Sequence, residues 1–214
     1  LQSGDGLRPV TGLGAFDAID TDKLVVAIGT EHGFNNGEGH VLEVRYAGQI
    51  LNEVIQEDAG PANGAVAIFY LDQPGSIGNG TIEVSASNPT GGIGGAHALP
   101  GTADGYGASH SATGNTANSV SLTTAGENSL LIAALENSGT PNGSGTPSGN
   151  SPLTQFASGF WGSQWGGFAC GAMEVSTPSQ VTATFSTVGG GNYSINVVAA
   201  EFLALVVVPN VTFR

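Results

Sequence analysis

Cationic side chains are the scarcest chemical group in this chain of 214 residues. Four of them, Arg8, Lys23, Arg45 and Arg214, stand against 17 Asp and Glu residues. Proteins that bind nucleic acids cluster cations to displace counterions from phosphates, and anionic membranes also attract basic patches. The formal net charge of −13 therefore argues against nucleic acid and against an anionic membrane surface as partners.

Cysteine is almost absent as well. Cys170 is the single cysteine, so no disulfide can form within the chain and buried apolar surface has to supply the stability. It lies in the apolar run Gly167–Met173, where a small buried thiol is expected. No nearby His is available to activate it as a nucleophile.

Long apolar runs and abundant charges are missing too. The longest apolar run, near Val197–Val208, contains Glu201 and is shorter than the 18 or more residues of a membrane-spanning helix. Charged residues make up only 10% of the chain, so Ser, Thr, Asn, Gln and 35 Gly have to cover the surface. These residues suit turns and solvent-facing strand positions better than helices, and composition therefore predicts β structure without membrane insertion.

Ten segments rich in Val, Ile and aromatic residues are predicted to be strands, because Gly, Asn, Pro or Asp bounds each one. They are Leu24–Thr30, Val41–Ala47, Gln49–Ile55, Ala65–Leu71, Thr81–Ser87, Ser119–Thr123, Ser129–Glu136, Phe168–Val175, Val181–Thr187 and Ser194–Val208. Several alternate: Val181, Ala183 and Phe185 share one face of their strand, and hydroxyls occupy the other. Residues 88–117 and 137–152 are predicted to be long connections, and no segment keeps a helical period.

These patterns predict an all-β fold, a single antiparallel two-sheet β-sandwich of jelly-roll type with long Gly/Ser/Asn-rich loops. The sandwich is expected over residues 20–203, with an N-terminal extension at 1–19 and a C-terminal strand extension at 204–214. A division into two domains at 137–152 is less favourable, since neither part has enough strands to close a sandwich. The apolar terminal strand has to be covered, either within its own domain or by a neighbouring subunit.

The order of segments between residues 22 and 202 resembles a family of secreted bacterial β-sandwich modules that occur as repeats in large surface proteins. The likeness rests on strand-and-turn signatures at Thr21–Ile28, Val44–Leu51, Ala67–Gly75, Gly80–Val84, Ser129–Ala134 and Tyr193–Ala200. It implies an extracellular jelly-roll domain, at a cell or virion surface, used in adhesion, surface layers or fibres. No catalytic residues come with the resemblance.

The richest polar cluster is a Gly-rich stretch at residues 31–40. Its candidate oxygen ligands are Glu31, Asn35, Asn36 and Glu38, which suit a hard cation such as calcium. His32 and His40 could instead join Glu31 in a zinc site, although no His-Glu-x-x-His helix frames them. A polar connecting loop without an ion is the first expectation, calcium the second, and zinc or another metal the third.

Both tryptophans of the chain lie in the segment 160–168. If this segment is extended, Trp161 and Trp165 share a face and are separated by about 13 Å, at about 3.3 Å per residue. Flat indoles can fill a core, anchor a subunit interface or stack on sugar rings, with Gln164 as a hydrogen-bonding partner for sugar hydroxyls. Core filling is the first expectation, an interface the second and a glycan platform the third.

Several acid–base constellations are weaker. His97 and His110 flank Asp104 and Tyr106, and Ser109 precedes His110, but no Gly-x-Ser-x-Gly elbow marks a nucleophile. Asp17, Asp20 and Asp22 lie close together ahead of the first strand, where solvation is expected first and a bridging cation second. The candidate acid pairs are Glu57 with Asp58, and Glu136 with Glu174. Paired acids can cleave glycosidic bonds, but nothing in the sequence separates these from ordinary surface acids.

The sequence therefore predicts a non-enzymatic extracellular structural or adhesive module, a subunit of a surface fibre, sheath or virion appendage. Its expected partners are copies of itself or other surface proteins, joined through terminal strands. The alternative is a glycan-binding module that uses Trp161 and Trp165, with or without calcium. A hydrolase ranks third, because it needs a pocket that gathers His97, His110 and a carboxylate.

Overall fold

The computed structural model describes residues 14–32, 40–58, 64–86, 89–114, 117–138, 145–147, 153–160, 166–187 and 195–205. These residues form antiparallel strands and one short 3-10 turn, with no α-helix, and none of them belongs to a helix able to cross a membrane. The elements are β1 (Ala15–Asp17), β2 (Lys23–His32), β3 (Val41–Tyr46), β4 (Gln49–Ile50), β5 (Asn52–Asp58), β6 (Ala65–Asp72), η1 (Pro74–Ser76), β7 (Asn79–Ala86), β8 (Pro89–Leu99), β9 (Ser109–Gly114), β10 (Ser119–Thr123), β11 (Ser129–Ser138), β12 (Gly145–Pro147), β13 (Thr154–Phe160), β14 (Gly166–Val175), β15 (Gln180–Thr187) and β16 (Ile195–Phe202). The prediction of an all-β antiparallel fold is confirmed.

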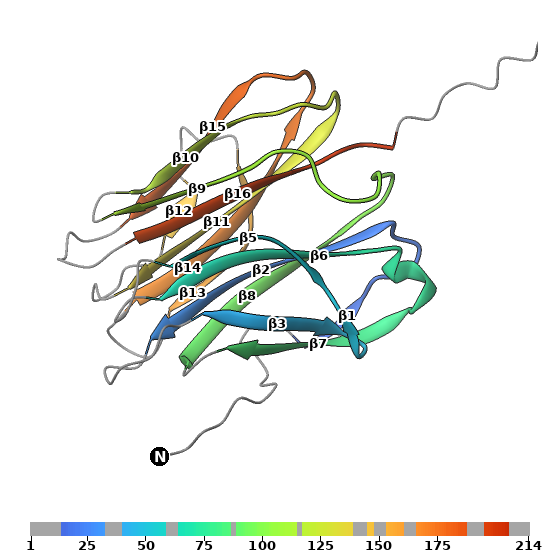
Figure 1. Ribbon diagram of the computed structural model, residues 1–214, viewed down its shortest axis with the longest axis horizontal. Helices are drawn as coiled ribbons and strands as arrows, with labels where there is room; N and C mark the ends of the chain where they lie inside the picture. The colour runs from blue at the N-terminus through green and yellow to red at the C-terminus, as the bar shows by residue number, and fades with distance from the viewer. Residues whose placement is uncertain are drawn as a thin grey trace, which may run out of the picture.

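The described strands build four sheets that lie in four layers (Figure 1). The N-outer sheet has the order β1-β7-β3-β4 and the N-inner sheet the order β5-β6-β2-β8. The C-inner sheet follows with β13-β14-β11-β16-β9, and the C-outer sheet with β10-β15-β12. The expected count of two sheets is therefore wrong: two outer sheets cover two inner ones, which also pack on each other.

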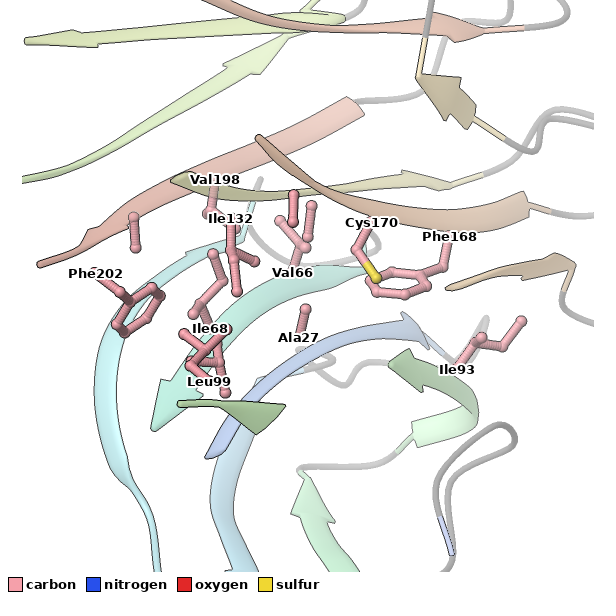
Figure 2. Close-up of a cluster of buried hydrophobic side chains, with 14 residues drawn as sticks. Ala27, Val66, Ile68, Ile93, Leu99, Ile132, Phe168, Cys170, Val198 and Phe202 are labelled. Atoms are coloured by element: carbon pink, nitrogen blue, oxygen red, sulfur yellow. The ribbon is translucent and has the colours of Figure 1, made fainter. Parts of the chain in front are cut away.

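Three hydrophobic cores separate the four layers. The N-terminal core receives Leu24, Val26 and Ile28 from β2, while Val25 and Ala27 point into the central core between the inner sheets. Figure 2 shows the central core, where Ala27, Val66, Ile68, Ile93 and Leu99 face Ile132, Phe168, Cys170, Val198 and Phe202. The C-terminal core lies between the C-inner and C-outer sheets. The central strands of the inner sheets are buried on both faces, β16 at all eight positions, which explains their continuous apolar runs.

The two halves of the chain repeat one topology. Strands β1, β2, β3, β5, β6, β7 and β8 correspond in order to β10, β11, β12, β13, β14, β15 and β16. Each ladder in the first set has its counterpart in the second: β1–β7 with β10–β15, β3–β7 with β12–β15, β5–β6 with β13–β14, β2–β6 with β11–β14, and β2–β8 with β11–β16. Strands β4 and β9 have no described counterpart.

Even a local irregularity recurs in both halves. The β5–β6 ladder shifts register between Glu53 and Ile55, so that Ile55 lies opposite Ile68. The β13–β14 ladder shifts at the corresponding place, between Gln155 and Ala157, where Ala157 lies opposite Cys170. Because a bulge inserts one unpaired residue, its recurrence fixes the correspondence of the halves residue by residue.

The halves pack on each other in the manner of a two-fold interface. Strand β5 contacts β16 and strand β13 contacts β8, and these two contacts exchange when the halves are exchanged; β2 faces β11. Mutual exchange of contacts is the property of an isologous interface between identical subunits. The chain is thus built as two similar sandwich-like halves joined through their inner sheets.

The sequence missed strands in segments it took for connections. Residues 88–117 contain β8 and β9, and residues 137–152 contain β12. The glycines of β8 were interpreted as loop residues, but a side chain at Gly95 would bring its Cβ to 2.5 Å from Ala157 Cβ and 3.0 Å from Cys170 Sγ. Gly95 is therefore demanded by the close approach of the inner sheets, and not by a turn.

Strand pairing also reaches into the two expected terminal extensions. Within residues 1–19, β1 pairs with β7, with Phe16 opposite Gly80, and Ala18 is buried. Beyond residue 203, Ala204 forms an antiparallel bridge with Thr102 of the same chain. The described part of each terminal segment thus belongs to the stack of sheets.

Candidate functional site

A cleft of about 730 Å³ opens where the two halves meet, beside the end of β8. Its walls come from His97–Leu99 of β8, residues 100–102, Asn128–Leu130 at the start of β11, Glu174–Ser176 at the end of β14, Phe202 and Ala204. This volume lies in the range of sites for small ligands or short peptide segments. It is the candidate binding site of the described residues.

The polar groups of the cleft do not converge on one point. The imidazole of His97 stacks on Phe156, with ring centroids 5.2 Å apart and planes inclined by 18°. Partial burial lowers the pKa of His97, so the ring is neutral at pH 7. The hydroxyl of Ser129 donates to Glu201 Oε1 at 2.8 Å, and Glu174 is exposed. In the part of the chain that the structure describes, the His97 ring has no hydrogen bond to a carboxylate.

The predicted set of His97, His110, Asp104 and Ser109 is not brought together. His97 lies on β8, beside β13, whereas His110 lies on β9, beside β5 at the opposite edge of the inner sheets. Asp104 is exposed, and Tyr106 packs edge-on against Tyr70 with ring centroids 5.9 Å apart. A pocket that gathers both histidines and a carboxylate is absent from the described residues.

Of the two predicted acid pairs, Glu57 and Asp58 are neighbours in β5, whereas Glu136 and Glu174 separate in space. In the β11–β14 ladder Glu136 lies opposite Phe168, while Glu174 lies opposite Leu130. Six residues along a strand amount to about 20 Å, far more than the roughly 5–9.5 Å between the two carboxyls of a glycosidase. Glu136 is buried and accepts a hydrogen bond from Asn196 Nδ2 at 2.9 Å, so it serves the end of the central core.

The predicted calcium and tryptophan sites fall mostly outside the described residues. Glu31 belongs to β2, but its side chain is not described, and Asn35, Asn36 and Glu38 lie outside the described ranges, as do Trp161, Gln164 and Trp165. Among described residues, no group of three or more His, Cys, Asp or Glu side chains is placed to hold a metal ion. Calcium, zinc and glycan binding through these residues stay predictions.

The acids ahead of β2 bind backbone groups separately. Asp17 Oδ1 accepts a hydrogen bond from the Ile19 amide at 2.9 Å, and Asp22 Oδ2 accepts one from the Gly101 amide. At the other end of the N-terminal half, His40 Nδ1 lies 3.2 Å from Asp58 Oδ2. Each carboxylate therefore serves a nearby turn or side chain.

The repeat relates the cleft to an equivalent position in the N-terminal half, and that position is filled. Asp72 corresponds to Glu174 and Lys23 to Leu130. Lys23 is fully buried, forms an ion pair with Asp72 and places Nζ 4.7 Å from the centre of the Tyr70 ring. The Gly105 amide donates to Asp72 Oδ2 at 3.1 Å, and Tyr106 covers Tyr70. Residues 103–108 thus cover the position in the N-terminal half that is equivalent to the cleft.

Glu201, on β16, is a carboxylate with several hydrogen-bond donors around it. Its oxygens accept bonds from the amides of Ala125 at 2.9 Å, Gly126 at 3.0 Å and Ala108 at 3.2 Å, and from the Ser129 hydroxyl. Burial by itself would raise the pKa of Glu201, but these bonds together outweigh it and hold the pKa below its ordinary value. The carboxylate ties β16 to the turn before β11.

Sequence reasoning missed the buried charges Lys23 and Glu201, and the half-buried Asp72 that pairs with Lys23. A usable signal exists for two of them: Lys23 directly precedes an apolar strand, and Glu201 interrupts the apolar run at the end of the described chain. A charge inside such a run has to be paired once the strand is buried on both faces. The expectation of a buried thiol is confirmed, since Cys170 lies in the central core.

Comparisons with protein-family models, with curated proteins and with solved structures find no match to this chain. The kinship with secreted surface-protein modules, expected from strand-and-turn signatures, stays a prediction.

Proposed function

We propose that this chain is a non-enzymatic structural or adhesive module, a building block of an extracellular fibre, sheath or virion appendage. The observation that carries the proposal is the use of its buried charges. Lys23 pairs with Asp72, and Glu201 binds the turn at residues 125–129, so these groups join structural elements and do not face the cleft. The extracellular location and a jelly-roll topology belong to the same proposal.

The outer sheets support this role through their exposed faces. On the C-outer sheet the hydroxyls of Ser121 and Thr182 face solvent and lie 2.6 Å apart. On the N-outer sheet Arg45 Nε donates to Glu43 Oε1 at 2.6 Å. A hydrated face rich in hydroxyls, on a chain with a net charge of −13, favours contact with polar surfaces or with copies of itself across a cation.

Sedimentation equilibrium at physiological salt, over a wide range of concentrations, tests the assembly version. We expect a mass above that of one chain that rises with concentration. A mass of one chain at every concentration would count against a role as an assembling subunit.

Hydrolysis assays test the non-enzymatic part of the proposal. Wild type and His97→Ala are compared on panels of esters, peptides and glycosides, since His97 is the imidazole that faces the cleft. We expect neither protein to turn over any substrate. Turnover by wild type that His97→Ala abolishes would show that the chain is an enzyme.

A further inference from the structure

The N-terminal half shows what kind of group fits at one end of the central core. Strand β2 places Lys23 between Asp72 of β6 and Leu99 of β8. The Lys23 ammonium pairs with the Asp72 carboxylate and lies 4.7 Å from the centre of the Tyr70 ring. The lysine side chain is fully buried. An alkylammonium group therefore occupies this position, with a carboxylate and an aromatic ring as its partners.

The C-terminal half has the anion of this position but not the cation. In the corresponding ladders Leu130 lies between Glu174 of β14 and Phe202 of β16. Leu130 stands where the other half has the lysine, and Ala172 where it has the tyrosine ring. Both side chains are uncharged and shorter than their counterparts. Leu130, Glu174 and Phe202 line the cleft of about 730 Å³.

We propose that the cleft binds a primary alkylammonium group, which takes there the place that the Lys23 ammonium has in the other half. The ammonium of the ligand pairs with the Glu174 carboxylate, and its apolar stem lies against Leu130 and Phe202. A small amine and the lysine side chain of a peptide both present this group. The binding activity goes beyond the proposed structural role and does not depend on it.

The Glu174 carboxylate is available for such a ligand. It is exposed, and in the part of the chain that the structure describes it forms no ion pair. The described Lys and Arg side chains are Lys23, which pairs with Asp72, and Arg45, which pairs with Glu43 on the N-outer sheet. The net charge of −13 also attracts cationic ligands to the chain.

The wall around this carboxylate suits an apolar stem. Leu99 and Phe202 lie toward the same end of the central core (Figure 2), and both line the cleft together with Leu130. Methylenes that leave water against this wall favour binding. Asn128 and Ser176 add an amide and a hydroxyl, which suit the remaining protons of an ammonium or the peptide groups beside a lysine.

Titration calorimetry with the full chain tests the proposal, with n-pentylammonium and Nα-acetyl-lysine N-methylamide as probes and 1-pentanol as the matched neutral probe. We expect the ammonium probes to bind at least about tenfold more tightly than 1-pentanol, because they can pair with Glu174. Tighter binding of the lysine derivative assigns the site to peptide lysines, and tighter binding of n-pentylammonium assigns it to small amines. The proposal is overturned if neither ammonium probe binds at millimolar concentration, or if 1-pentanol binds as tightly as they do.

Glu174→Gln removes the charge of the site and keeps the size of the side chain. We expect the affinity for both ammonium probes to fall about tenfold, while the affinity for 1-pentanol stays the same. Glu53→Gln, at an exposed position of β5 in the other half, is the matched control and should bind the probes as wild type does. Equal affinities of Glu174→Gln and wild type for the ammonium probes would contradict the proposal.

Leu130→Lys copies the Lys23 of the N-terminal half and places an ammonium of the chain itself beside Glu174. Because this side chain fills the site, we expect the ammonium probes to bind at least about tenfold more weakly than to wild type. Leu130→Met adds length without charge and should retain binding, and circular dichroism checks that the sheets remain in both variants. A folded Leu130→Lys that binds the probes as tightly as wild type would show that the cleft is not the equivalent of the Lys23 position, which overturns the proposal.

Discussion

The repeat relates two positions in this molecule that differ in what they contain: one holds a buried cation and the other is a cleft. In the N-terminal half the buried Lys23 and the half-buried Asp72 and Tyr70 lie beneath Gly105 and Tyr106. In the C-terminal half the corresponding residues are Leu130, Glu174 and Ala172, and the space beside them is the open cleft. The strands around both positions pair in the same way, so the topology does not cause the difference.

In the N-terminal half the segment that follows the last strand covers this position. Residues 100–108 follow β8, cover the N-terminal position and continue into β9. Where such a segment covers a buried cation, it also provides the partners that burial requires. An interior charge in one half and a cleft in the other are thus two outcomes of one architecture.

The largest effect is expected from breaking the ion pair of the N-terminal position. Asp72→Ala leaves the fully buried Lys23 without its carboxylate, and we expect a loss of about 3 kcal/mol in the free energy of unfolding. Lys23→Leu copies the Leu130 of the other half and leaves a carboxylate that reaches solvent, so its cost should be below about 1 kcal/mol. Urea unfolding monitored by circular dichroism measures both.

The double variant Lys23→Leu/Asp72→Ala sharpens this prediction. Since it removes both charges, it should be more stable than Asp72→Ala alone. Glu174→Ala, at the equivalent exposed position, should change stability by less than about 0.5 kcal/mol. A double variant that is less stable than Asp72→Ala would show that the unpaired cation is not the source of the loss.

The second largest effect concerns Glu201, which occupies in the C-terminal half the place of Ala98. Glu201→Gln replaces an acceptor of several backbone amides by a group with a single acceptor oxygen, and we expect a cost of about 2 kcal/mol at pH 7. Urea midpoints at pH 7 measure this loss. Glu53→Gln, on an exposed position of β5, is the matched control and should change little.

The same carboxylate predicts a pH dependence of stability. The folded pKa of Glu201 lies below its ordinary value, so its stabilising contribution is complete at pH values above that ordinary value. It is lost as the pH falls through the folded pKa. Wild type should therefore lose more stability than Glu201→Gln between pH 5 and the acid limit of about pH 2. Parallel curves for the two proteins would contradict this assignment.

The sequence predicted strands well where the residues of a single strand carry the pattern. Strand Ser119–Thr123 has the bounds that were expected, and the hydroxyl face of 181–186 lies outward, opposite the buried Ala183 and Phe185. The bulk of the all-β assignment rests on such alternation and on β-branched runs. These features are set by the residues of one strand.

The arrangement in four layers could not be predicted from such local patterns, because it depends on which sheets pack against the two faces of each strand. A continuous apolar run such as 195–202 fits a strand between two cores, but it also fits an edge or terminal strand. In β8, Gly95 is fixed by its contact with Ala157 on another sheet, which no local pattern reveals. The candidate cleft was missed for the same reason, since residues distant in the sequence form its walls.

A further prediction tests why the repeat differs at Gly95, which corresponds to Val198. Gly95→Ala places a Cβ against Ala157 and Cys170, and we expect a loss of about 2 kcal/mol from overpacking. Thermal unfolding measures it. Ala96→Gly, on the other face of the same strand, is the control for backbone entropy and should cost less than about 1 kcal/mol. A neutral Gly95→Ala would show that the inner sheets can separate to admit a methyl group.

The smallest effect is expected from opening the filled position. Tyr106→Ala removes the aromatic side chain that covers Tyr70 and should leave in the N-terminal half an opening like the cleft of the C-terminal half. Tyr106 is 40% exposed, so the loss of its edge-on ring contact should cost about 1 kcal/mol. Tyr106→Phe keeps the ring and should retain wild-type stability, which separates ring packing from the hydroxyl. If Tyr106→Ala is as costly as Asp72→Ala, the cover of Lys23 depends on the ring as well as on the ion pair, and the two positions differ more than their shared topology indicates.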